Sequence, residues 1–137
     1  MRIRDLAASW SDKTLSILRI TTGIVLLQHP IQKFFMFPVE RAGPAMFSQG
    51  WFAGVIELVL TPLLIIGFFT RPVAFILAGL MAFAYFLGHA PRSFFPSVNG
   101  GSLAIMYCFV CLYLAAAGGG PWSVDAALEK RGTRLPA

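Results

Sequence analysis

Four apolar runs, separated by short polar breaks, dominate the pattern of the sequence. They cover approximately residues 15–37, 51–69, 73–88 and 101–117. Each is close to the roughly 20 residues that a helix needs to cross a bilayer. Proline and glycine mark short junctions between the runs, so successive helices are expected to pack antiparallel. The pattern predicts an all-α, integral membrane, antiparallel four-helix bundle that forms one domain over residues 1–137.

The segment before the first run has a different pattern. Residues 3–13 are amphipathic and are expected to form a short segment on the membrane surface. The first run carries Arg19, His29 and Lys33 and has no clear small-residue cleavage site. It is therefore interpreted as a retained helix and not as a signal peptide.

Composition supports the membrane interpretation. The chain is 57% hydrophobic and 12% charged, whereas soluble domains average roughly 45–50% apolar and about 25% charged residues. The net charge of +5 would suit a nucleic acid, but the basic residues form no patch with stacking aromatics. The lipid bilayer is the expected partner, and nucleic acid is not.

The distribution of Lys and Arg predicts the orientation in the membrane. One side of the membrane, which holds the loops 37–50 and 90–100, has only three of these residues: Lys33, Arg41 and Arg92. Under the positive-inside rule both termini are then cytoplasmic and both loops face outward. The basic residues assigned to the cytoplasmic side number eight: Arg2, Arg4, Lys13, Arg19, Arg71, Lys130, Arg131 and Arg134.

Ionisable side chains inside the predicted helices are the candidate functional groups. Glu57 lies about 9 Å below the outer boundary at the helical rise, where an unpaired charge costs roughly 2.5–3.5 kcal/mol or more. His29 and Lys33 are four residues apart and share a helix face. We expect Glu57 to contact Lys33, His29 or His89, with Asn99 in the same layer. Such a pair either forms part of a ligand site or only locks the helices in register.

Two further residues are weaker candidates. Cys108 and Cys111 have the spacing of a redox dithiol. However, they lie in an apolar helix, where thiols usually behave as small hydrophobic side chains. The sequence contains no spacing typical of a zinc site, a phosphate-binding glycine loop or a nucleophile elbow, so no metal site is predicted.

Several motifs give the chain a family resemblance. They are LLQHPIQKFF, FAGVIELVLTPLLIIGFFTR, His89 followed by FFPSVNGG, and GGGPWSVDAAL. In this order they resemble the DoxX family over roughly residues 18–128. The resemblance implies a four-helix protein of the bacterial inner membrane. Some members are associated with oxidoreductase complexes, including thiosulfate oxidation that passes electrons to quinone.

The resemblance also points to individual positions. The family motifs include Gly100 and the five candidate residues named above: His29, Lys33, Glu57, His89 and Asn99. The chain departs from the family pattern twice, since Pro30 replaces a usual glycine and Ser102 replaces a frequent acidic residue. The second departure puts any chemistry that depends on that acid in doubt.

Three functions are consistent with these residues. The first is a redox-associated subunit with an outer-leaflet pocket for a quinone or a similar lipophile, to which a partner oxidoreductase would bring electrons. The second is a non-enzymatic binder or transporter of a small lipophilic molecule, for which four short helices favour a homodimer. The third is a structural subunit that anchors a soluble partner. The sequence does not decide whether the chain is an enzyme.

Overall fold

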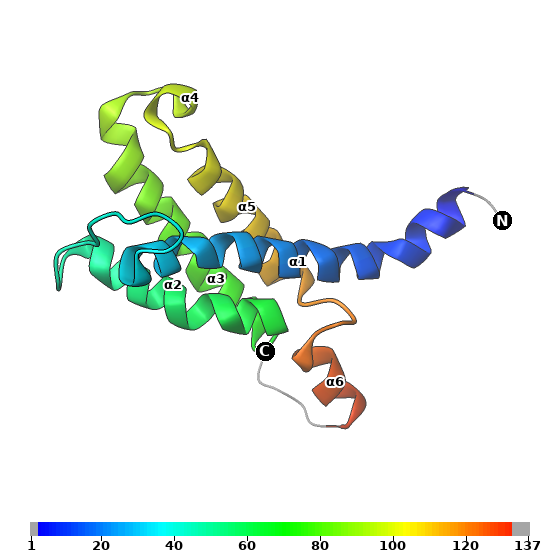
Figure 1. The fold of residues 1–137 in the computed structure, drawn as a ribbon. Helices are drawn as coiled ribbons and strands as arrows, with labels where there is room; N and C mark the ends of the chain where they lie inside the picture. Colours follow the sequence, from blue (N-terminus) through cyan, green and yellow to red (C-terminus); the bar gives the residue numbers. More distant parts are fainter. Residues whose placement is uncertain (1–2, 133–137) are drawn as a thin grey trace.

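The computed structural model describes residues 3–132, apart from the side chain of residue 4. Arg2 and Arg134, which contribute to the charge asymmetry above, lie outside the described residues, as does the side chain of Arg4. All regular elements of the described chain are helices, and a longer loop connects the first two (Figure 1). Its elements are α1 (Ile3–Phe35), α2 (Gln49–Ile66), α3 (Thr70–Phe83), a π-helix (Ala84–His89), a 3-10 turn (Ala90–Arg92), α4 (Pro96–Asn99), α5 (Ser102–Ala117) and α6 (Val124–Lys130).

Long helices pack as two antiparallel pairs. In the first pair, Lys33 near the end of α1 meets Glu57 near the start of α2, and Arg19 meets the last turn of α2. In the second pair, Arg71 at the start of α3 reaches the last turn of α5. Figure 1 shows the α3–α5 pair rising away from α1 and α2 toward α4. We call the two ends of the molecule the Lys33 end and the Arg19 end.

The predicted helices are present, with shifted boundaries. The first begins at Ile3, so residues 3–13 continue α1 as one helix instead of forming a separate surface segment. No proline or glycine interrupts residues 3–22, and nothing local therefore ends the helix there. The third begins at Thr70 and changes to a π-helix at Ala84, which ends at His89. The predicted fourth helix is α5.

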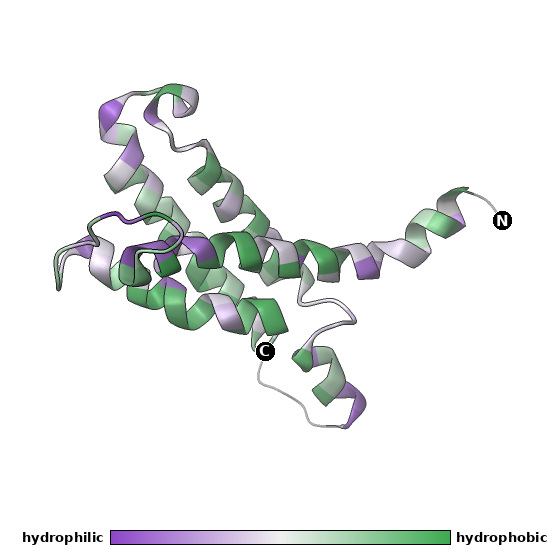
Figure 2. Ribbon diagram, viewed as in Figure 1, coloured by the Kyte–Doolittle hydropathy of each residue, from purple (hydrophilic) through white to green (hydrophobic). Residues whose placement is uncertain are grey.

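Apolar side chains cover both the core and the outside of this fold. The core contains Leu26, Leu64, Leu77, Leu114 and their neighbours, while large side chains such as Phe75, Phe83 and Phe109 are exposed. Figure 2 shows hydrophobic colouring along the long helices and polar residues gathered mainly at helix ends and turns. Two helical stretches, Gln49–Ile66 and Thr70–Arg92, are long and apolar enough to cross a membrane, and Ser102–Ala117 is a shorter apolar helix.

Candidate functional site

An ion pair between α1 and α2 forms the centre of the candidate site. Lys33 Nζ donates a hydrogen bond to Glu57 Oε2 at 2.7 Å. The Glu57 side chain is only 6% exposed, whereas that of Lys33 is 31% exposed. The predicted basic partner of Glu57 is therefore present, and it is Lys33. The Lys33 side chain is therefore partly accessible to another molecule, whereas that of Glu57 is almost fully buried.

Two local features bring these side chains together. Ser48 caps α2 by accepting a hydrogen bond from Trp51 N at 3.2 Å, and this fixes the start of the helix that carries Glu57. Gly54 then allows α1 to approach α2, because a Cβ at this position would lie 2.8 Å from the Phe34 ring and 3.2 Å from Lys33 Cδ. A larger residue at 54 would clash with the Phe34 ring and crowd the Lys33 side chain.

A small cavity adjoins the ion pair. Its volume is about 180 Å³, and its lining comes from the end of α1 and from the loop that follows: His29, Gln32, Lys33, Arg41, Ala42, Gly43 and Pro44. The loop lies directly over the helix end, since a Cβ on Gly43 would approach the Lys33 carbonyl oxygen to 2.4 Å. The cavity thus gives a bound molecule access to Lys33 and His29 together.

Two buried hydroxyls that the sequence analysis did not select lie one turn deeper. Tyr107 on α5 packs edge-to-face against His29, with ring centroids 6.1 Å apart. Thr61 lies on the same face of α2 as Glu57, four residues on, and the antiparallel register places it across from His29. Neither hydroxyl has a hydrogen-bond partner within residues 3–132. Spacing from Glu57 could have identified Thr61, but no sequence signal links Tyr107 to this site.

The remaining predicted residues form a separate group. His89 Nδ1 lies 3.0 Å from the carbonyl oxygen of Asn99, and Asn99 is 2% exposed. The Asn99 amide donates to Ser93 O at 2.9 Å and accepts from Gly101 N at 2.7 Å. These bonds hold the turn between the π-helix and α5. Among the described residues, no hydrogen bond or ion pair connects this group to Lys33 and Glu57.

The two cysteines lie on α5. Both are free thiols. Cys111 is fully buried within the apolar core, and Cys108 packs against that core. Their surroundings are those of small hydrophobic side chains. Among residues 3–132, no group of three or more His, Cys, Asp or Glu side chains is arranged to hold a metal ion.

At the opposite end, Arg19 forms a network that the sequence analysis interpreted only as topological charge. Its side chain is fully buried. Nε donates to Gly119 O at 2.8 Å, Nη2 donates to Trp122 O at 2.7 Å, and Nη1 donates to Leu64 O at 2.8 Å and also to Ile65 O. Arg19 therefore ties the unsatisfied carbonyls at the end of α2 to the loop after α5. The position of Arg19 inside an apolar run was the sequence feature that could have indicated a buried structural role.

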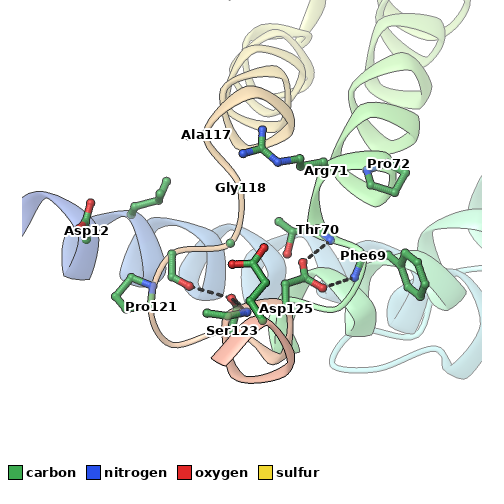
Figure 3. A pocket seen from close by; sticks show the side chains of 15 residues that line it. Asp12, Phe69, Thr70, Arg71, Pro72, Ala117, Gly118, Pro121, Ser123 and Asp125 are labelled. Carbon is green, nitrogen blue, oxygen red and sulfur yellow. Dashed lines mark hydrogen bonds between the residues drawn. The ribbon is translucent and has the colours of Figure 1, made fainter. Parts of the chain in front are cut away.

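Asp125 on α6 completes this end of the fold. Its two carboxylate oxygens accept hydrogen bonds from Phe69 N and Thr70 N, both at 2.8 Å (Figure 3). A residue distant in sequence thus caps the start of α3, for which Phe69 itself provides no side-chain cap. A carboxylate at a helix N-terminus is also favoured by the helix dipole.

Comparison with known proteins agrees with the family resemblance. The sequence model of the DoxX family matches residues 14–90, more than half of the chain. An uncharacterized protein of Haemophilus influenzae is 39% identical over 127 residues, covering 85% of this chain and 92% of its own length. An uncharacterized membrane protein of Mycobacterium tuberculosis is 27% identical over 135 residues, covering 85% and 82% respectively. No solved structure matches the chain significantly. On the family match and the first relative, this chain belongs to the DoxX family.

Proposed function

We propose that this chain is a multi-pass protein of the bacterial inner membrane, with α1, α2, α3 and α5 forming a transmembrane four-helix bundle. Support comes from the apolar helices of spanning length, from the family match and from the relative named as a membrane protein. The Lys and Arg distribution favours cytoplasmic termini. The Lys33 end then faces outward and the Arg19 end faces the cytoplasm.

Within this arrangement, the Lys33–Glu57 site binds the head ring of a quinone or of a similar small lipophile. The observation that carries this proposal is the partly buried Lys33–Glu57 ion pair beside the cavity of about 180 Å³. A quinone carbonyl needs hydrogen-bond donors, which the partly exposed Lys33 side chain and the His29 ring supply. Glu57 holds the lysine in place and offers a proton acceptor within hydrogen-bond distance of it.

The size of the cavity limits what it holds. Pockets for whole drug-sized ligands measure about 300–1,000 Å³, so about 180 Å³ fits a single ring better than a complete lipophile. A hydrocarbon tail would remain in the bilayer. Phe34 and Trp51 lie at the same end in an edge-to-face contact, with ring centroids 6.4 Å apart, but they are not among the residues that line the cavity.

A redox role requires a partner protein. Quinone reduction consumes two electrons and two protons, and the chain's ionisable groups can deliver only the protons. We therefore assign it the role of a quinone-binding subunit, to which an oxidoreductase partner delivers electrons. The same site without a partner would serve a binder or transporter.

Replacement of Glu57 tests the site. Purified wild-type protein, Glu57→Gln and the control Glu40→Gln, an exposed outer-loop residue, would be titrated with a short-chain ubiquinone by tryptophan quenching. We expect at least tenfold weaker binding for Glu57→Gln, because Lys33 loses the charge that positions it, and unchanged binding for Glu40→Gln.

Thermal unfolding of the same samples distinguishes a site from a structural lock. If the pair serves the ligand, the quinone raises the melting temperature of wild type and of Glu40→Gln but not of Glu57→Gln. Equal binding by all three proteins, with only Glu57→Gln destabilised, would show that the pair merely fixes the helices. Absence of quinone binding by wild type would refute the proposal.

A further inference from the structure

A second and larger cavity lies at the Arg19 end, away from the site above. Its volume is about 470 Å³, which is within the range of ligand pockets. Its walls come from α1, from the start of α3, from the loop after α5 and from α6 (Figure 3). Apolar side chains such as Leu15, Phe69 and Pro121 line it together with charged ones. It lies where the apolar helix α3 begins and the apolar helix α5 ends, at the expected depth of lipid headgroups.

One wall of the cavity offers unused hydrogen-bond donors. Arg71 donates through Nη1 to Ala115 O at 3.2 Å and to Ala116 O, and no bond from its Nε or Nη2 is formed to residues 3–132. Next to it, Thr70 is one of the residues that line the cavity. It is fully buried, and its hydroxyl, which lies under Gly119, has no hydrogen-bond partner in the described chain. Unsatisfied buried hydroxyls are rare and indicate that something else bonds them.

The cavity also carries carboxylates that do not pair with this arginine. Asp125 is occupied by the backbone of α3. Asp12 and Glu129 line the cavity from α1 and α6, and neither forms an ion pair with Arg71 in the described structure. Opposite charges thus face one cavity without contacting each other, an arrangement complementary to a ligand that itself carries both charges.

Two glycines keep this space open. Gly118 has φ +91°, and a Cβ there would lie 3.4 Å from Arg71 Nη2. A Cβ on Gly119 would lie 2.7 Å from the Thr70 hydroxyl oxygen. Side chains at either position would therefore crowd the two donors.

We propose that this cavity binds a zwitterion with a phosphate and a primary ammonium group, the headgroup chemistry of an aminophospholipid. Arg71 and the Thr70 hydroxyl bind the phosphate, whereas Asp12 and Glu129 attract the ammonium. The partly apolar walls and the position at the ends of apolar helices favour a membrane lipid over a soluble molecule as the source. This site is independent of the quinone site, because none of its residues is shared.

Lipid binding to the purified full-length protein tests this site. Native mass spectrometry would compare phosphatidylethanolamine, phosphatidylglycerol and phosphatidylcholine of the same chain length, with soluble phosphoethanolamine as a fourth probe. We expect wild type to prefer phosphatidylethanolamine. Thr70→Val and Glu129→Gln should each lower that affinity about tenfold or more, comparable to the loss of one hydrogen bond to a charged group.

Matched controls are Thr21→Val, an exposed threonine on α1, and Glu40→Gln, an exposed glutamate in the outer loop, neither of which should change lipid affinity. Thr70→Val removes a hydroxyl that has no partner within residues 3–132, so its unfolding temperature without lipid should stay near that of wild type. Equal binding of soluble phosphoethanolamine would support the headgroup chemistry and identify a soluble source. Preference for phosphatidylglycerol, no preference among lipids, or a preference that survives both variants would overturn the proposal.

Discussion

Replacement of Arg19 by methionine tests how the Arg19 end is held together. Methionine keeps much of the length of the side chain but removes every donor. The four carbonyls that Arg19 serves, at Leu64, Ile65, Gly119 and Trp122, would lose their partner in a buried setting. Two of these carbonyls belong to the end of α2 and two to the loop after α5. Without the Arg19 donors, both segments would lose these bonds to α1.

The expected loss of stability follows from burial. Each hydrogen bond to a charged group contributes about 1.5–3 kcal/mol, but burying the guanidinium offsets part of that sum. Each buried carbonyl left without a donor costs about 1–3 kcal/mol, and after the relieved desolvation of the guanidinium is subtracted we expect a net loss of about 3–5 kcal/mol. For a chain of this length that free energy corresponds to a fall of about 10–15 °C in melting temperature. Arg19→Lys should be intermediate, since one ammonium cannot span both segments as a planar guanidinium does.

Tryptophan fluorescence during thermal and denaturant unfolding in mild detergent would measure the effect. The matched control is Arg41→Met, which removes an exposed arginine in the outer loop and should change stability by no more than about 0.5 kcal/mol. If Arg19→Met unfolds within about 1 kcal/mol of wild type, the hydrogen bonds do not stabilise the fold and the reasoning fails.

Two further predictions concern topology and the thiols. In a background without native cysteines, single cysteines at Ala45 and Ser97 should react with an impermeant maleimide in intact cells, whereas one at Ala126 should not; the reverse pattern would invert the proposed orientation. Joint replacement of Cys108 and Cys111 by alanine should leave folding and quinone affinity nearly unchanged, because both thiols pack as small apolar groups. Loss of electron transfer in that variant, at normal expression, would instead favour a redox dithiol.

Periodicity and punctuation predicted the long helices because both act locally. An apolar run ended by glycine or proline specifies a helix whatever it packs against, so α2, α3 and α5 lie close to their predicted ranges. The prediction that residues 3–13 form a separate segment was wrong because no local signal ends the helix there. A change from polar to apolar residues alters what surrounds a helix, but it does not end one.

The pairing of Glu57 was also accessible from the sequence, because a carboxylate in an apolar helix requires a basic partner nearby. The sequence did not show that this partner would be Lys33 and not His29 or His89. That choice depends on the register of α1 against α2, which Gly54 permits through a close approach. Within residues 3–132, no hydrogen bond or ion pair joins His89 or Asn99 to Lys33 or Glu57.

The Arg19 end shows this limit most clearly. Its contacts join residues about 45 to 106 positions apart: Arg19 to Leu64 and Gly119, Asp125 to Thr70, and Ser16 to Trp122. Backbone carbonyls and N–H groups are the main partners, and every residue carries these groups, so the side-chain pattern contains no record of which ones are used. The sequence alone determined the helices and the need to neutralise Glu57. Only the packed chain decided which backbone groups Arg19 and Asp125 satisfy, and therefore where the larger cavity forms.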